Sequence, residues 1–107
     1  VFPFQMKLTK KPQGHGYTRA RVKFDNPFHP QDLEFLGHEF HYSSCDTENN
    51  TGFQYCLQLT KGAGVGGGKD GLIYKNTFAC YTHLHALSVP GWAERFVQAC
   101  VDRRAES

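Results

Sequence analysis

A glycine-rich stretch in the second half of the chain limits the possible folds more than any other feature. Six of the ten residues in 62–71 are glycine, and apolar side chains are frequent in the flanking segments 53–60 and 72–75. Glycine adopts positive φ readily and weakens regular structure, so such a stretch favours a turn. We therefore expect two strands joined as a hairpin with a long, mobile tip.

A glycine-rich loop can also hold a phosphate, because successive backbone N–H groups can surround an anion. The P-loop pattern has a glycine five residues before a Gly-Lys pair and a serine or threonine after it. Here Ala63 occupies the first of these positions and Asp70 the last. The segment that follows is also patterned as a strand rather than a helix, so the sequence favours the hairpin.

Most of the remaining chain is patterned as strands. Residues 17–24 have a good period-2 pattern, with Tyr17 and three basic residues on one face and Thr18 and three apolar residues on the other, which is typical of a strand with one buried face. Residues 1–9 alternate more loosely, and 76–84 are apolar enough to form a buried strand. Turn-forming or polar composition predicts loops in 25–30 and 44–52.

The C-terminal segment has the period of a helix. Ser88 is a plausible N-cap, and Pro90 is tolerated in a first helical turn. One apolar stripe has helical spacing and is formed by Trp92, Phe96, Ala99, Cys100 and Val101. We expect an α/β fold that is strand-rich, with one C-terminal amphipathic helix packed on the sheet.

Composition excludes several classes of protein. The chain has 107 residues, enough for one domain, and a formal net charge of +2, too small for binding to nucleic acid or anionic lipid driven by charge. No apolar run approaches the roughly 18 residues of a membrane span. The chain starts at Val1 without a signal peptide, so we expect a piece of a longer protein in the cytoplasm.

The four cysteines contain no C-x-x-C pair, which argues against a zinc knuckle or a redox dithiol. We expect all four to be buried thiols, although two disulfides stay possible on sequence grounds. They are Cys45, Cys56, Cys80 and Cys100.

Four of the six histidines form two clusters, His38-x-x-His41 and His83-x-His85. Imidazole changes charge near neutral pH and can act as a base or a metal ligand. The spacing of these histidines alone favours a structural role over a catalytic one for each of them. Few carboxylates lie nearby in the sequence to complete a metal site. Within one strand 76–84, alternation would also turn Cys80 and His83 to opposite faces, so they make a poor nucleophile and base pair.

Three blocks of the sequence resemble a known family. They are 37–43 (Gly-His-Glu-Phe-His-Tyr-Ser), 70–72 (Asp-Gly-Leu) and 76–85 (Asn-Thr-Phe-Ala-Cys-Tyr-Thr-His-Leu-His). Their order and spacing resemble the C-terminal half of the class I glutamine amidotransferase domain in the cobyrinate a,c-diamide synthase family, of the cobyric-acid-synthase type. The resemblance extends over nearly the whole chain, so residues 1–107 are expected to be the C-terminal part of that domain.

The resemblance implies a site in which a cysteine thiolate attacks the carboxamide of glutamine. The family's Tyr-x-His block corresponds to 81–83, which makes His83 the catalytic base, with Tyr81 and His85 as supporting residues. Its Gly-x-Glu-x-His block corresponds to 37–41, which gives Glu39 and His41 a site-lining or structural role. The family's nucleophile lies in an upstream Cys-Gly-Gly turn that this chain lacks, so we expect the chain alone to be inactive.

The resemblance also implies the partners of the complete enzyme, a ligase of cobalamin biosynthesis. Ammonia from glutamine would amidate a tetrapyrrole carboxylate that ATP and Mg²⁺ activate in an upstream domain, so this chain itself is expected to bind no cofactor and no metal. Residues 11–17 resemble relatives associated with sirohaem amidation, so sirohaem or a sirohydrochlorin derivative is an alternative substrate.

Two other functions stay open from the sequence. One is a non-catalytic interaction module that keeps the amidotransferase fold, and the other is a small metal-binding protein that uses His38, His41, His83 and His85. Absence of the upstream half would expose a sheet face or edge, so we also expect self-association or marginal stability of the isolated chain.

Overall fold

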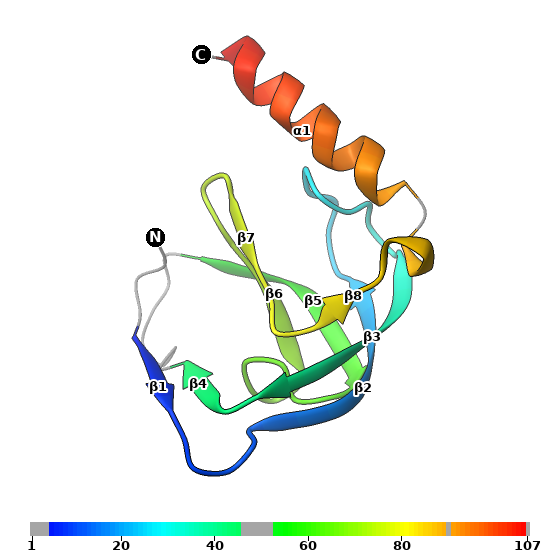
Figure 1. Cartoon of the computed structure of the whole chain (residues 1–107). Coiled ribbons are helices and arrows are strands. Elements are labelled where there is room, and N and C mark those ends of the chain that lie inside the picture. The colour runs from blue at the N-terminus through cyan, green and yellow to red at the C-terminus, as the bar shows by residue number, and fades with distance from the viewer. Residues whose placement is uncertain (1–4, 46–52, 90, 107) are drawn as a thin grey trace.

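The computed structural model describes residues 5–45, 53–89 and 91–106, which form a curled, strand-rich body with one α-helix at the C-terminal end (Figure 1). This confirms the predicted fold class. In chain order the elements are β1 (Met6–Leu8), β2 (Gly14–Val22), β3 (Glu34–His41), β4 (Ser43–Cys45), β5 (Gln54–Lys61), β6 (Lys69–Tyr74), β7 (Thr77–Ala79), β8 (His83–Leu84), the 3-10 helix η1 (Ala86–Ser88) and α1 (Trp92–Glu106).

Six strands form one antiparallel sheet in the order β7-β6-β5-β2-β3-β8, so β7 and β8 are its edges. β1 and β4 pair in a separate two-stranded sheet. β4 begins at Ser43 and extends into the segment 44–52 predicted as a polar loop, because it pairs with a strand far away in the sequence. Residues 1–4 of the predicted first strand and 46–52 of that loop lie outside the described residues.

The core lies on one face of the sheet, as the alternation in β2 predicts. Thr18, Ala20 and Val22 are buried, whereas Tyr17 and the arginines beside it are exposed. Burying each large aliphatic side chain of this face contributes about 1.5–3 kcal/mol. The central cluster consists of Ala20, Val22, Phe35, Cys56, Leu57, Leu59 and Val89.

The glycine-rich stretch forms the tip of the β5–β6 hairpin, so the predicted hairpin is confirmed. The tip folds back on itself: the Leu59 amide donates to the Gly68 carbonyl at 2.7 Å and the Val65 amide to the Lys69 carbonyl at 2.8 Å. Gly64 has a φ of 61°, and a Cβ at this position would collide with the Lys69 carbonyl oxygen. Glycine is therefore required here by both backbone conformation and close approach.

The single strand predicted for 76–84 is wrong. The segment forms two short strands, β7 and β8, on opposite edges of the sheet. The chain turns between them because the buried carboxylate of Asp70 accepts hydrogen bonds from the amides of Tyr81, at 3.0 Å, and Thr82, at 2.9 Å. Side-chain acceptors of this kind compete with a strand ladder for backbone donors.

Helix α1 begins at Trp92, and Figure 1 shows it extending from the sheet on the side away from β1 and β4. Pro90 lies outside the described residues. The predicted apolar stripe is largely uncovered, because Trp92, Phe96, Cys100 and Val101 are all exposed and Ala99 is half-buried, so the expected packing of this stripe on the sheet is not seen in the described residues. Arg95 connects the helix to the loop 25–30: it donates to the Asn26 carbonyl and lies 3.5 Å from the Asp25 carboxylate. No helix in the described residues is long and apolar enough to cross a membrane.

Candidate active site

Strand β3 sends the two histidines of the first cluster to opposite faces of the sheet. Glu39 and His41 are buried on the inner face, whereas His38 and Phe40 are exposed on the outer face. Side chains alternate along a strand, so a spacing of three residues places two histidines on different faces. The predicted site residues are thus divided between an inner cluster and an outer pair.

The inner cluster begins with Glu39, whose carboxylate lies under the hairpin tip. It accepts hydrogen bonds from the amides of Ala63, at 2.7 Å, and Gly64, at 2.9 Å, and lies 3.2 Å from His41 Nε2. Burial alone would raise the pKa of Glu39, but these three hydrogen bonds together lower that pKa below its ordinary value. Glu39 is therefore an ionised carboxylate that anchors the tip to β3.

His41 links this carboxylate to Tyr81. Its Nδ1 lies 3.1 Å from the carbonyl oxygen of Ser43, and its ring stacks on Tyr81 with centroids 3.6 Å apart and planes at 10°. Both nitrogens of His41 face acceptors, so both hydrogen bonds form only when each nitrogen carries a proton. The hydrogen-bonding capacity of His41 is used within the fold, which agrees with a structural role.

Tyr81 completes the inner cluster. Its hydroxyl lies 2.6 Å from Ser43 Oγ, and burial raises its pKa to about 12, so the phenol stays neutral. With its amide bound to Asp70, Tyr81 is held at both backbone and side chain. This restraint fixes the segment that leads directly into β8.

The outer pair consists of His83 on β8 and His38 on β3. These residues are direct partners in the antiparallel register, and His83 Nδ1 lies 3.2 Å from His38 Nε2. The ring centroids are 4.7 Å apart and the ring planes meet at 72°. Both side chains are exposed, so His83 is open to a partner on the outer face.

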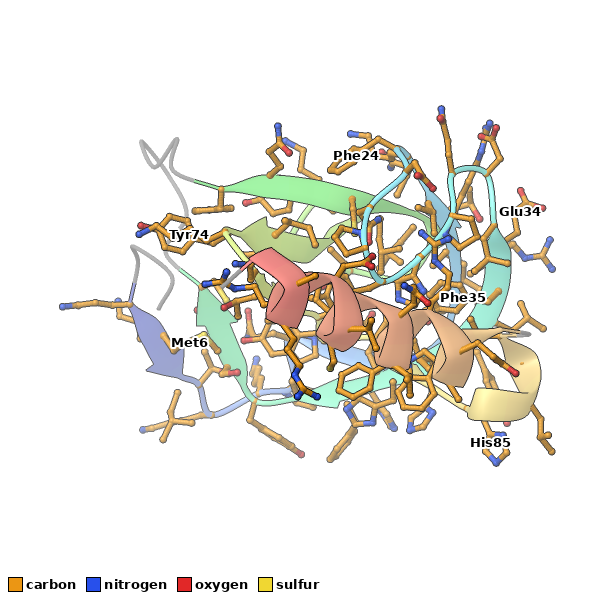
Figure 2. All side chains as sticks on the ribbon, turned by 90° about the horizontal axis from the view of Figure 1, so that it is seen from above. Met6, Phe24, Glu34, Phe35, Tyr74 and His85 are labelled. Carbon is orange, nitrogen blue, oxygen red and sulfur yellow. The ribbon has the colours of Figure 1, made fainter. Side chains whose placement is uncertain are left out.

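Gly37 makes this approach of β8 to β3 possible. A Cβ at residue 37 would collide with the His83 carbonyl oxygen and would lie 2.7 Å from Thr82 Cγ2. His85, the second histidine of its cluster, lies farther along at the outside of the molecule next to η1 (Figure 2). Its Nδ1 accepts a hydrogen bond from the Leu87 amide at 3.2 Å, so the structure shows a local role for this ring in the turn.

The four-histidine metal site is not supported by this geometry. His41 lies on the inner face, with Nε2 bound to Glu39 and Nδ1 to Ser43, whereas His38 and His83 meet on the outer face. Among the described residues, no group of three or more His, Cys, Asp or Glu side chains is placed to hold a metal ion.

The four cysteines are free thiols, and the expectation that all are buried is confirmed only for Cys56: Cys45 and Cys80 are half-buried, and Cys100 is exposed on α1. Burial raises the pKa of both Cys56 and Cys80 to about 12 and also raises that of Cys45. The Cys80 thiol donates to the Thr82 carbonyl at 3.0 Å. Cys80 and His83 do not lie in one strand, so alternation does not determine how their side chains face each other. The Cys80 thiol is still a poor nucleophile because it stays protonated.

The hairpin tip does hold an anion, although not a phosphate. The amides of Ala63 and Gly64 that could face a phosphate are already bound to Glu39. These two amides are therefore not available to a phosphate.

Comparison with known proteins adds an independent observation. Residues 1–90 match the family described as the CobB/CobQ-like glutamine amidotransferase domain. The chain belongs to this family. The match includes every residue of the inner cluster and of the outer pair. No solved structure matches the chain significantly.

Curated relatives agree with the family. The chain is 36% identical over 104 residues to a protein of Methanosphaera stadtmanae, covering 97% of this chain and 23% of that protein. It is 40% identical over 93 residues to one of Magnetococcus marinus (87% and 20%) and 38% identical over 93 residues to one of Methanobrevibacter smithii (86% and 21%). Each relative is named cobyrinate a,c-diamide synthase, and the chain spans about a fifth of their length.

Sequence reasoning about this amidotransferase domain missed three contributors to the site. It did not pair His38 with His83, assign Asp70 to the turn, or bring the glycine-rich tip onto Glu39. One signal was present in the sequence: Asp70 precedes the apolar pair Leu72-Ile73, and a carboxylate on a buried strand requires partners.

Proposed function

We propose that this chain supplies the general base of a glutamine amidotransferase domain and that His83 is that base. The observation that carries the proposal is the position of His83. It is the exposed histidine of the Tyr-x-His block, held on a short strand by a buried network and open to the outer face. A base must be accessible to the group it deprotonates, and the buried His41 is not.

The chemistry follows from a neutral imidazole. His83 Nε2 accepts the thiol proton as the cysteine sulfur bonds to the glutamine carbonyl carbon. The resulting imidazolium returns the proton to the departing nitrogen, which leaves as ammonia, and a thioester of glutamate remains. Water, deprotonated by the same imidazole, then releases glutamate and the free thiol.

The nucleophile is proposed to lie in a different part of the enzyme. Raised pKa values keep the thiols of Cys45, Cys56 and Cys80 protonated, and Cys100 lies on α1, outside the sheet that carries His83. A cysteine in a sharp strand-to-helix turn facing the outer side of β8 would complete the site. The chain alone is accordingly inactive.

The complete enzyme is proposed to be an ATP-driven ligase that transfers the ammonia to a tetrapyrrole carboxylate. The names of the curated relatives support cobyrinate as that substrate. ATP and Mg²⁺ would act outside this chain, in agreement with the occupied hairpin tip. Sirohaem or a sirohydrochlorin derivative, amidated by the same chemistry in the cytoplasm, is the alternative substrate.

The test is glutamine hydrolysis by the full-length enzyme with ATP and either tetrapyrrole present. His83→Ala is expected to reduce the rate by about 10²- to 10⁴-fold, the usual contribution of a general base. His85→Ala is the matched control, since its ring binds only a local amide in the structure, and should retain most activity. Full activity in His83→Ala would contradict the assignment, and no hydrolysis by the wild type would favour the non-catalytic interaction module.

The same outer face supports the proposal that the isolated chain self-associates. β8 is an edge strand, and Leu36 and Leu87 nearby are 60% and 88% exposed. Unpaired edges and exposed apolar side chains favour association. Sedimentation of the 107-residue chain should show species larger than a monomer at high concentration, whereas a sharp monomer at every concentration would contradict this.

A further inference from the structure

The contact between His38 and His83 is fixed by the sheet. The two residues are direct partners in the β3–β8 register, and Gly37 permits the close approach of the strands. Their side chains therefore meet on one face, with His83 Nδ1 3.2 Å from His38 Nε2. The pairing arises from backbone geometry, so it does not depend on a chance orientation of two surface rings.

A hydrogen bond between two neutral imidazoles has two possible directions. If His83 Nδ1–H donates to His38 Nε2, then His83 Nε2 keeps its lone pair and can accept a proton. If His38 Nε2–H donates instead, the proton of His83 lies on Nε2, and that nitrogen cannot act as a base. Only the first direction is compatible with the function proposed for His83.

We propose that His38 is a positioning residue for His83, a step that rests on the proposed function. His38 Nε2 accepts the Nδ1 proton of His83, holds the tautomer with a basic Nε2, and stabilises the imidazolium that forms when His83 takes the thiol proton. In serine proteases a carboxylate performs this task for the catalytic histidine. Here a neutral imidazole occupies the equivalent position.

The neighbouring carboxylate cannot take this role. Glu39 follows His38 directly in the sequence, but it points to the inner face and is bound to Ala63, Gly64 and His41. On the outer face, His38 is flanked instead by Tyr17, its register partner on β2, with the exposed Arg19 next along that face. On this face His38 also lines a shallow groove of about 370 Å³, together with His15, Tyr17 and Phe40.

The first test compares His38→Leu and His38→Gln in the full-length enzyme. Leucine removes the acceptor, and glutamine restores one because its side-chain oxygen reaches about as far as Nε2. We expect His38→Leu to lower kcat about tenfold or more with KM for glutamine unchanged, as for the outer partners of other functional imidazoles, and His38→Gln to recover most of the rate. His15→Leu, another exposed histidine of this face, is the control and should behave as the wild type.

The pH profile of kcat separates positioning from a merely structural role. Without the acceptor the His83 imidazolium is less stable, so the acid limb of the profile should move to lower pH in His38→Leu and return in His38→Gln. An acid limb that does not move in His38→Leu, or a His38→Gln variant as impaired as His38→Leu, would overturn the proposal.

The tautomer itself is the second test. In the full-length enzyme labelled with ¹⁵N-histidine, the His83 signals are assigned by their loss in His83→Ala, and their shifts report which nitrogen carries the proton. We expect the proton on Nδ1 in the wild type and a shift toward Nε2 in His38→Leu. A proton on Nε2 in the wild type would overturn the proposal. Full activity in His83→Ala would instead remove the proposed function, so the two failures are distinguishable.

Discussion

Glu39 and His38 are neighbours in the sequence, yet they belong to two regions with opposite physical character. Glu39 lies in a buried cluster in which every strong acceptor and donor has a partner within the fold. His38 lies in an exposed pair with His83, open to another molecule or segment. The difference shows how one strand can contribute to the buried structure through one face and leave side chains accessible to a partner on the other.

The two regions are coupled through the segment between β7 and β8. Asp70 binds the amides of Tyr81 and Thr82, and Tyr81 stacks on His41. His83 follows almost immediately, so the buried cluster determines where the exposed His83, the proposed base, lies. Substitutions in the inner cluster should therefore reduce both stability and activity, whereas substitutions of His38 or His83 should reduce activity alone.

The largest effect on stability is expected from Glu39→Gln. The substitution replaces a buried carboxylate that binds the Ala63 and Gly64 amides and His41, and each of these buried hydrogen bonds that is lost costs about 1–3 kcal/mol in the free energy of unfolding. The loss in the free energy of unfolding is measured by denaturant unfolding. Glu34→Gln, on the exposed face of the same strand (Figure 2), is the control and should change that free energy by less than about 0.5 kcal/mol. Equal effects of the two variants would remove the distinction between the faces.

Gly37→Ala should affect both regions at once. The new methyl group would displace the His83 carbonyl and Thr82, so we expect a loss of about 1–3 kcal/mol in stability together with reduced glutamine hydrolysis. Unfolding of the chain and kcat of the full-length enzyme give the two values. A variant with wild-type values in both assays would show that the close approach of β8 has no functional importance.

Tyr81→Phe tests a single contact of the inner cluster. It keeps the stack on His41 but removes the hydroxyl that lies 2.6 Å from Ser43 Oγ, so the free energy of unfolding should fall by about 1 kcal/mol. Tyr17→Phe on the outer face is the matched control and should leave stability unchanged, because Tyr17 is 78% exposed. A larger loss of stability in Tyr17→Phe than in Tyr81→Phe would contradict the importance of the buried hydroxyl.

The smallest effect is a pH dependence that arises from Glu39. Its pKa in the folded chain is below its ordinary value of 4.5, so its contribution to stability is present above about pH 4.5 and is lost as pH falls through the lower folded pKa. The stability difference between wild type and Glu39→Gln should therefore shrink between pH 5 and pH 3 in denaturant unfolding. A difference that stays constant over this range would show that folding does not lower the pKa of Glu39.

The sequence predicted those parts of the structure that follow from local pattern. Alternation in 17–24 placed the buried face of β2 correctly, and the glycine-rich stretch predicted the β5–β6 hairpin. The break between β7 and β8 could not be predicted, because it depends on Asp70 from another strand. The contact of His38 with His83 likewise requires the β3–β8 register, which neither segment encodes alone.

The central claim is that His83, on the outer face, activates a thiol supplied from outside this chain. It is tested most directly by labelling the full-length enzyme with an electrophilic glutamine analogue and measuring the rate by mass spectrometry. The account predicts a labelled cysteine outside residues 1–107 and labelling slowed about 100-fold or more in His83→Ala. Labelling of Cys45, Cys56, Cys80 or Cys100, or an unchanged rate in His83→Ala, would contradict it.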